Sequence, residues 1–143
     1  MRNTSKLVAI FVIICGVQFA NAGVSLEEMK KAGMLVRSIC QPKFNIPDDQ
    51  ADGYAKGIFP DNKDSKCYVN CVFENMQSMK RGKFQYEAMK KQAELLLPPE
   101  IKDSNIKAME VCKSCTDGIK DHCEAGFALL LCMHKNTELF VFP

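Results

Sequence analysis

Seven cysteines spread over residues 40–132 constrain the fold of this chain more than any other feature. They are Cys40, Cys67, Cys71, Cys112, Cys115, Cys123 and Cys132, and an eighth, Cys15, lies in an apolar N-terminal segment. Cysteines of an exported protein are usually oxidised to disulfides, and an odd number leaves one thiol over. The sequence therefore predicts a disulfide-bridged domain with one free cysteine, and by itself leaves the pairing open.

The first 22 residues have the pattern of a secretory signal peptide. Arg2 and Lys6 precede an apolar run over residues 7–19, and Ala20-Asn21-Ala22 places small residues where a signal peptidase cleaves. The alternative is a membrane anchor, but the run is shorter than the roughly 20 residues needed to cross a bilayer. We expect residues 1–22 to be removed, residues 23–143 to form one domain, and the protein to be extracellular, in sensillar lymph or another secreted fluid.

Charge and motifs exclude several classes of function. Without Arg2 and Lys6, 17 basic and 17 acidic residues remain, which gives no electrostatic footprint for nucleic acid or an anionic membrane. No stable membrane insertion is expected, because no other stretch is long and apolar enough to span a bilayer. His122 lies beside Asp121 and Cys123, but Asp121 is expected to cap a helix, and a bridged cysteine is no nucleophile. The sequence predicts no catalytic residues, no metal site and no cofactor, and hence no enzyme.

Helical signals dominate the rest of the chain. Ser25 and Glu28 form a capping-box pattern ahead of an apolar stripe, and Pro42, Gly57, Pro60 and Pro98-Pro99 interrupt later runs. Helices are expected over residues 26–40, 47–56, 64–79, 86–97, 102–116 and 121–135, with a turn at residues 81–83 and no hairpin. The predicted fold class is all-α, a compact six-helix domain stapled by disulfides around an apolar cavity.

Helix geometry limits how two pairs of cysteines can bond. Cys67 and Cys71 are separated by four positions, and Cys112 and Cys115 by three, within expected helices. Cβ atoms at such positions lie about 5–6 Å apart, whereas a disulfide needs about 3.8 Å. The two cysteines of each pair are therefore not expected to bond to each other. Those that form disulfides are expected to join their helix to other elements.

The cysteine spacing resembles that of the insect odorant-binding proteins, the PBP/GOBP family. Leaving Cys115 aside, the gaps are 26, 3, 40, 10 and 8 residues, and the second and fifth are the most specific. Further segments resemble LUSH-like members: residues 40–44, 66–68, 97–100 and the end at Phe142-Pro143. The resemblance implies the disulfides Cys40–Cys71, Cys67–Cys123 and Cys112–Cys132, and leaves Cys115 as the free thiol.

The resemblance also implies a secreted carrier of odorants, pheromones or similar semiochemicals, which delivers a small hydrophobic ligand to an olfactory receptor as a monomer or weak homodimer. The expected wall of the pocket consists of apolar side chains from every helix and the tail: Leu35, Ile39, Phe44, Tyr54, Ile58, Phe59, Phe73, Met76, Met79, Phe84, Met89, Leu96, Met109, Phe127, Leu130, Phe140, Val141 and Phe142. Methionines suit ligands of varied shape. The alternative function is a secreted disulfide-rich protein that acts through its surface on a protein or lipid partner.

The last eight residues, 136–143, are expected to close the pocket as a lid. Four of the final five side chains are large and apolar, and leaving them in water would be unfavourable. The resemblance implies that Arg37 and Tyr68 hold the Pro143 carboxylate, and each lies three residues before one cysteine of the expected Cys40–Cys71 bridge. Acid would then loosen this latch.

Overall fold

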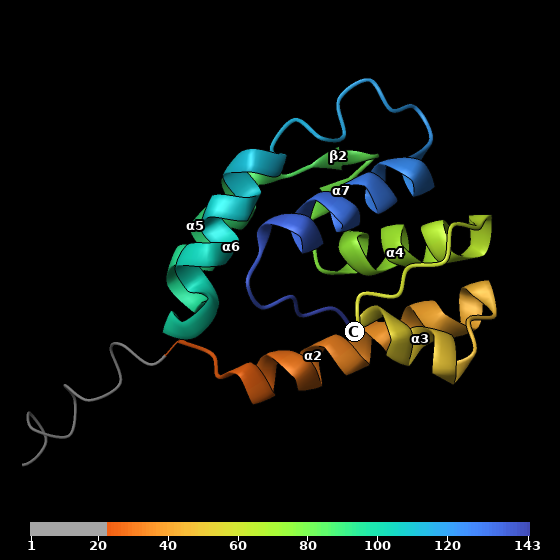
Figure 1. Cartoon of the computed structure of the whole chain (residues 1–143), viewed down its shortest axis with the longest axis horizontal. Helices are drawn as coiled ribbons and strands as arrows, with labels where there is room; N and C mark the ends of the chain where they lie inside the picture. The colour runs from red at the N-terminus through yellow and green to blue at the C-terminus, as the bar shows by residue number, and fades with distance from the viewer. Residues whose placement is uncertain (1–22) are drawn as a thin grey trace, which may run out of the picture.

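Residues 23–143 are described by a computed structural model, and the expected signal peptide, residues 1–22, lies outside them. The described residues form six α-helices, a short 3-10 helix and a two-stranded hairpin (Figure 1). Their bounds are α2 Leu26–Cys40, η1 Gln41–Phe44, α3 Asp48–Tyr54, α4 Lys63–Asn75, β1 Met79–Lys80, β2 Lys83–Phe84, α5 Tyr86–Leu96, α6 Pro99–Cys112 and α7 His122–Asn136. The all-α, six-helix fold class is confirmed. None of the helices in this part of the chain is both long and apolar enough to cross a membrane.

Helices α4 and α7 pack against each other at the centre of the molecule. In Figure 1, α2 and α3 lie on one side of this pair, and α5 and α6 lie at one end of it. The close approach depends on Gly126, because a Cβ atom there would lie 2.9 Å from the Cα atom of Asn70. The buried side chains include Val69, Val72, Phe127, Leu129 and Leu130.

Several helix ends follow the polar signals in the sequence, and others differ. Helix α4 is capped by Asn62 rather than by Asp64 or Ser65 and ends at Asn75 rather than at Met79, and α6 ends at Cys112 rather than near Thr116. The capping box of α2 is present, with the Glu28 amide donating to Ser25 Oγ at 3.2 Å, and Asp121 accepts from the Glu124 amide at the start of α7. Helix α6, however, begins at Pro99 rather than near residue 102. A proline fits the first turn of a helix because its missing N–H would have no partner there. The Pro98-Pro99 pair therefore both stops α5 and starts α6.

The expected absence of a hairpin was wrong. Strand β1 pairs with β2 in antiparallel register, Met79 opposite Phe84 and Lys80 opposite Lys83. The two connecting residues, Arg81 and Gly82, both have positive φ angles, 52° and 74°, as the common two-residue hairpin turn requires. The turn itself was expected, but an Arg at the first of these positions is uncommon in hairpins, so the strand pairing was missed. Met79 lies in a strand rather than in the expected helix.

Three disulfides staple the helices together. Cys40–Cys71 joins the end of α2 to α4, Cys67–Cys123 joins α4 to the start of α7, and Cys112–Cys132 joins the end of α6 to α7; the Cα–Cα distances are 5.8, 4.4 and 5.8 Å. These are the pairs that the resemblance implies. Cys115 has a free thiol and lies in the turn after α6, not within that helix.

Candidate functional site

Two cavities flank helix α2. The first, here called the helix cavity, has a volume of about 490 Å³ and lies between α2, the end of α4, α5 and α6. The second, the tail cavity, has a volume of about 610 Å³ and lies between α2, α3 and the C-terminal segment 139–143. Each is within the size range of sites that hold small molecules, about 300–1,000 Å³.

The two cavities share three residues, Met29, Gly33 and Met76. Gly33 brings the tail close to α2, since a Cβ atom at this position would lie 3.1 Å from the Cβ atom of Pro143. Unbranched methionine side chains change rotamer readily and adapt to what they contact. Met29 and Met76 therefore form a movable partition between the cavities.

The walls of the helix cavity are apolar apart from three amide side chains. Its lining contains Val24, Val36, Met89, Leu96 and Met109, and the amides Asn75, Gln77 and Gln92. One of these amides is already engaged, because Asn75 Nδ2 donates to the Cys71 carbonyl at 2.8 Å. This cavity therefore offers mainly buried area to a ligand, worth about 25 cal/mol per Å² of apolar surface.

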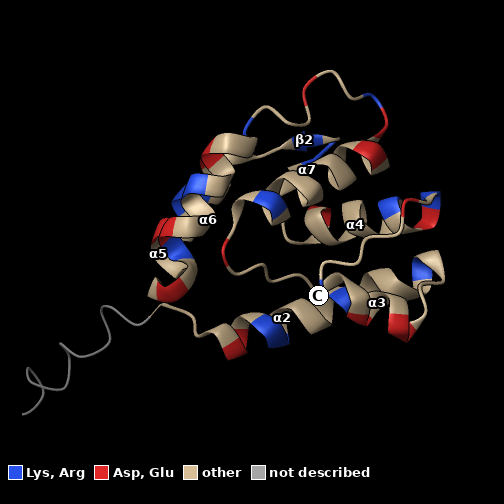
Figure 2. Ribbon diagram, in the orientation of Figure 1, with Lys and Arg blue, Asp and Glu red and all other residues tan. Residues whose placement is uncertain are grey.

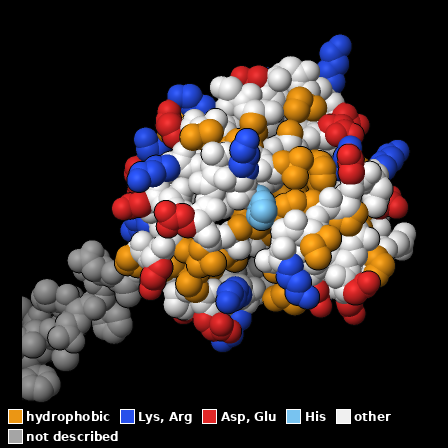
Figure 3. All heavy atoms as spheres, in the orientation of Figure 1, with side chains coloured by type: hydrophobic (Ala, Val, Ile, Leu, Met, Phe, Trp, Pro, Cys, Tyr) orange, Lys and Arg blue, Asp and Glu red, His pale blue; other side chains and the backbone are white. Residues whose placement is uncertain are grey.

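The tail folds back across the molecule and contacts α2 and α7. Phe140 packs edge-on against Phe59 and His134, with ring centroids 6.0 and 5.1 Å away. Figure 3 shows a histidine at the edge of a group of apolar side chains on the face in view. Phe142 is only 5% exposed, so most of its apolar surface is removed from water on docking.

Phe142 occupies the aromatic core that the sequence assigned to the pocket. Its ring lies 5.6 Å from that of Tyr54, 6.3 Å from that of Tyr68 and 5.5 Å from that of Phe73. Contacts of this kind contribute roughly 0.5–1.5 kcal/mol each beyond the buried area. The tail thus fills the aromatic centre of the domain and borders the tail cavity, while no tail residue lines the helix cavity.

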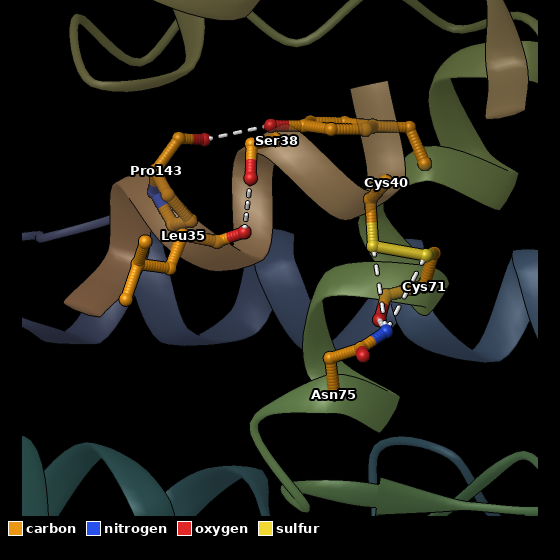
Figure 4. The surroundings of a disulfide bond; sticks show 7 residues. Leu35, Ser38, Cys40, Cys71, Asn75 and Pro143 are labelled. Atoms are coloured by element: carbon orange, nitrogen blue, oxygen red, sulfur yellow. Dashed lines mark hydrogen bonds between the residues drawn. A yellow bond between two sulfur atoms is a disulfide. The ribbon is translucent and has the colours of Figure 1, made fainter. Parts of the chain in front are cut away.

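Tyr68 is held next to the end of the tail. Its hydroxyl donates to the Pro143 oxygen at 3.0 Å, and Pro143 lies beside α2 close to the Cys40–Cys71 bridge (Figure 4). Burial raises the pKa of Tyr68 to about 12, opposed by the nearby charge of Arg37. The hydroxyl is therefore a neutral donor throughout the physiological pH range.

The expected role of Arg37 as a partner of Pro143 was wrong. Its guanidinium instead donates to Asp52 at 2.7 Å, to Gln41 at 2.8 Å and to the Asp48 carbonyl at 3.3 Å. Helix α3 supplies the Asp48 and Asp52 acceptors and η1 supplies Gln41, and these groups bind the planar guanidinium in place of the tail. The acid-sensitive ion pair is thus missing from the arrangement.

The expected wall residues fall into three groups. Seven line a cavity: Met76, Met89, Leu96, Met109, Phe140, Val141 and Phe142. Eight lie in or against the packed core instead: Phe44, Tyr54, Phe59, Phe73, Met79, Phe84, Phe127 and Leu130. Leu35, Ile39 and Ile58 line neither cavity and are 70%, 47% and 61% exposed, so their assignment to the wall was wrong.

Several lining residues were missed, and α2 contributes the largest group of them. Met29, Gly33 and Val36 face the cavities, and with buried Cys40 they recur at intervals of three or four residues along the helix. That spacing defines one helix face. Taking Cys40 as the centre of the face would have found these residues and excluded Leu35 and Ile39.

The fold and the cavities define a class of small helical proteins. Three disulfides bridge the domain, and cavities of ligand size lie between its helices and beside its C-terminal tail. The model of the PBP/GOBP family matches residues 23–136, and the chain belongs to this family. Members of the family are carriers and not enzymes, in agreement with the sequence prediction.

Individual relatives agree with this assignment. The chain is 43% identical to general odorant-binding protein 72 of Anopheles gambiae, over 84% of this chain and 99% of that one, and 39% identical to general odorant-binding protein 19a of Drosophila melanogaster, over 96% of both. Among solved structures, odorant-binding protein 4 of Chrysopa pallens superposes with a TM-score of 0.75 at 33% identity, covering 84% of this chain and 99% of that one. Odorant-binding protein 5 of Apis mellifera gives 0.75 at 29% identity, covering 85% and 100%.

Proposed function

We propose that this protein is a secreted carrier that binds a small hydrophobic ligand in the two cavities that flank α2 and delivers it to a receptor. The ligand would be an odorant, a pheromone or a similar semiochemical, and residues 1–22 would be the signal peptide that exports the protein. The observation that carries the proposal is the pair of adjoining cavities around Met29 and Met76, bounded by helices that disulfides hold together. A cross-linked shell can tolerate an apolar cavity that would otherwise cost stability.

We further propose that residues 139–143 act as a lid on the tail cavity. Phe142 anchors the segment in the aromatic core, while Leu139 and Val141 line the cavity itself. Opening would require Phe142 to leave its site, at a cost of roughly 1.5–3 kcal/mol for one large apolar side chain. The lid would therefore be closed most of the time and open often enough to exchange ligand.

Displacement of the neutral fluorescent probe N-phenyl-1-naphthylamine by hexadecanol tests this function. We expect saturable probe binding by the chain without residues 1–22 and competitive displacement by the alcohol. Deletion of residues 139–143 should weaken binding several-fold, whereas Leu95→Gln, an exposed position outside both cavities, should leave it unchanged. Absence of probe binding would favour the alternative, a protein that acts through its surface on a protein or lipid partner.

A further inference from the structure

The two cavities differ in charge. The helix cavity is lined by no Asp, Glu, Lys or Arg. The charged groups that line the tail cavity are three cations, Lys30 and Arg37 from α2 and Lys56 from the turn after α3, and two anions, Asp52 and the terminal carboxylate of Pro143. Elsewhere the charges of the two signs are interspersed over the helices (Figure 2), so this excess of cations is local.

The cations of the tail cavity are not all neutralised. Arg37 pairs with Asp52 at 2.7 Å and lies 3.7 Å from an oxygen of Asp48. Within residues 23–143, neither Lys30 nor Lys56 takes part in an ion pair. The Pro143 oxygen is bound by the Tyr68 hydroxyl and likewise forms no ion pair. Two ammonium groups from different elements are therefore free to meet an anion at one cavity.

The apolar interior behind these lysines favours an amphipathic partner. Met29, Met34 and Phe140 line the same cavity, and beyond the Met29–Met76 partition lies the uncharged helix cavity. A charged group would be costly in the helix cavity, where no opposite charge lies in the wall. Lysines can extend their ammonium groups to the mouth while their methylene stems cover apolar surface. One ligand with a charged end and a long chain would match both cavities in a single orientation.

We propose that the site takes a long-chain carboxylate, with its head group between Lys30 and Lys56 and its hydrocarbon chain passing Met29 and Met76 into the helix cavity. This assignment rests on the proposed carrier function and specifies the ligand class. The lysines supply a charge-assisted contact that an alcohol or ester cannot match. The hydrocarbon chain of the ligand contributes most of the affinity through buried apolar area.

Paired ligands and matched lysine variants test the assignment. Hexadecanoate and methyl hexadecanoate share a chain and differ in charge at pH 7.5, where a carboxyl group is ionised. Each ligand is titrated against bound N-phenyl-1-naphthylamine in the wild-type protein, in K30Q, in K56Q and in the double variant. K31Q is the control, because Lys31 is exposed on the same helix and lines neither cavity.

We expect the double variant to bind hexadecanoate about three- to tenfold more weakly, an effect typical of partly exposed charge pairs, and the ester within about twofold of wild type. K31Q should resemble wild type with both ligands. Equal losses for acid and ester, no loss in the double variant, or an equal loss in K31Q would overturn the assignment while leaving the carrier function standing. Failure of both ligands and the probe to bind wild type would instead overturn the carrier function.

Discussion

Pro143 lies against Gly33, and a Cβ atom at Gly33 would lie only 3.1 Å from the Cβ atom of Pro143. The absence of a side chain on one helix position thus lets the end of the tail touch the backbone of α2. The same glycine borders both cavities. The contact therefore links the position of the tail to the shape of the proposed ligand site.

Gly33→Ala should loosen the tail without destabilising the domain. The new methyl group would push Pro143 outward, while alanine favours the helix by up to about 1 kcal/mol over glycine. We expect an unchanged or slightly higher melting temperature together with faster chymotryptic cleavage after Phe140. Lys31→Ala on the same helix should leave the cleavage rate at its wild-type value. Equal cleavage rates in Gly33→Ala and wild type would show that the contact does not hold the tail.

Tyr68→Phe should weaken tail docking by the value of one hydrogen bond, about 0.5–1.5 kcal/mol. Faster amide hydrogen exchange over residues 139–142 would report the weaker docking of the tail.

Because the pKa of Tyr68 is raised to about 12, the folded state favours the protonated phenol. The protonated phenol should stabilise the fold fully below pH 10, the pKa of tyrosine in the unfolded chain. This stabilisation should be lost as the pH rises towards 12, the pKa in the folded protein. A wild-type tyrosinate absorbance titration in which all three tyrosines ionise near pH 10 would contradict this.

Gly126→Ala should destabilise the domain even though alanine is the better helix former. A Cβ atom there would meet the Cα and Cβ atoms of Asn70 at 2.9 Å, and backbone atoms cannot move aside as a flexible side chain can. Overpacking of this kind costs typically about 1–3 kcal/mol, so thermal unfolding should begin several degrees lower. A raised melting temperature would mean that α4 and α7 separate more easily than their contact suggests.

Alkylation of the unreduced protein should label Cys115 alone, and slowly. Burial raises the pKa of its thiol, which lowers the fraction of reactive thiolate at neutral pH. Cys115→Ser should change the free energy of unfolding little, whereas Cys112→Ser should lower it by about 3 kcal/mol because it opens a disulfide. Peptide mapping that finds the label on Cys112 would reverse the two roles.

Local sequence patterns, such as helix caps and prolines, predicted much of the fold correctly. The Ser25–Glu28 capping box, the Asp121 cap and the stops at prolines appear in the structure as expected, because each depends on neighbours in the chain. The turn at residues 81–83 was expected, but the pairing of β1 with β2 was not, because Arg81 adopts a positive φ without being one of the residues that favour it in hairpin turns.

The site was harder to predict because burial and cavity lining are different properties. Tyr54 and Phe73 were correctly expected inside, but the interior around them is filled by Phe142 of the tail. Which apolar side chains border empty space depends on how far apart α2, α5 and the tail lie, and no local pattern encodes that distance. The prediction for Arg37 was wrong for a related reason, since two of its three acceptors, Asp52 and the Asp48 carbonyl, come from α3, which the sequence could not place beside α2.

A single tryptophan placed in the helix cavity tests the central claim, that the cavities hold a hydrophobic ligand, most directly. The chain has no tryptophan, so Met89→Trp would report from the cavity wall alone, and Leu95→Trp, on the exposed side of α5, is its control. The account predicts blue-shifted emission from Met89→Trp that transfers energy to bound N-phenyl-1-naphthylamine and recovers when hexadecanol is added, with a weaker response from Leu95→Trp. Equal responses from the two variants, or none from Met89→Trp despite probe binding, would contradict it.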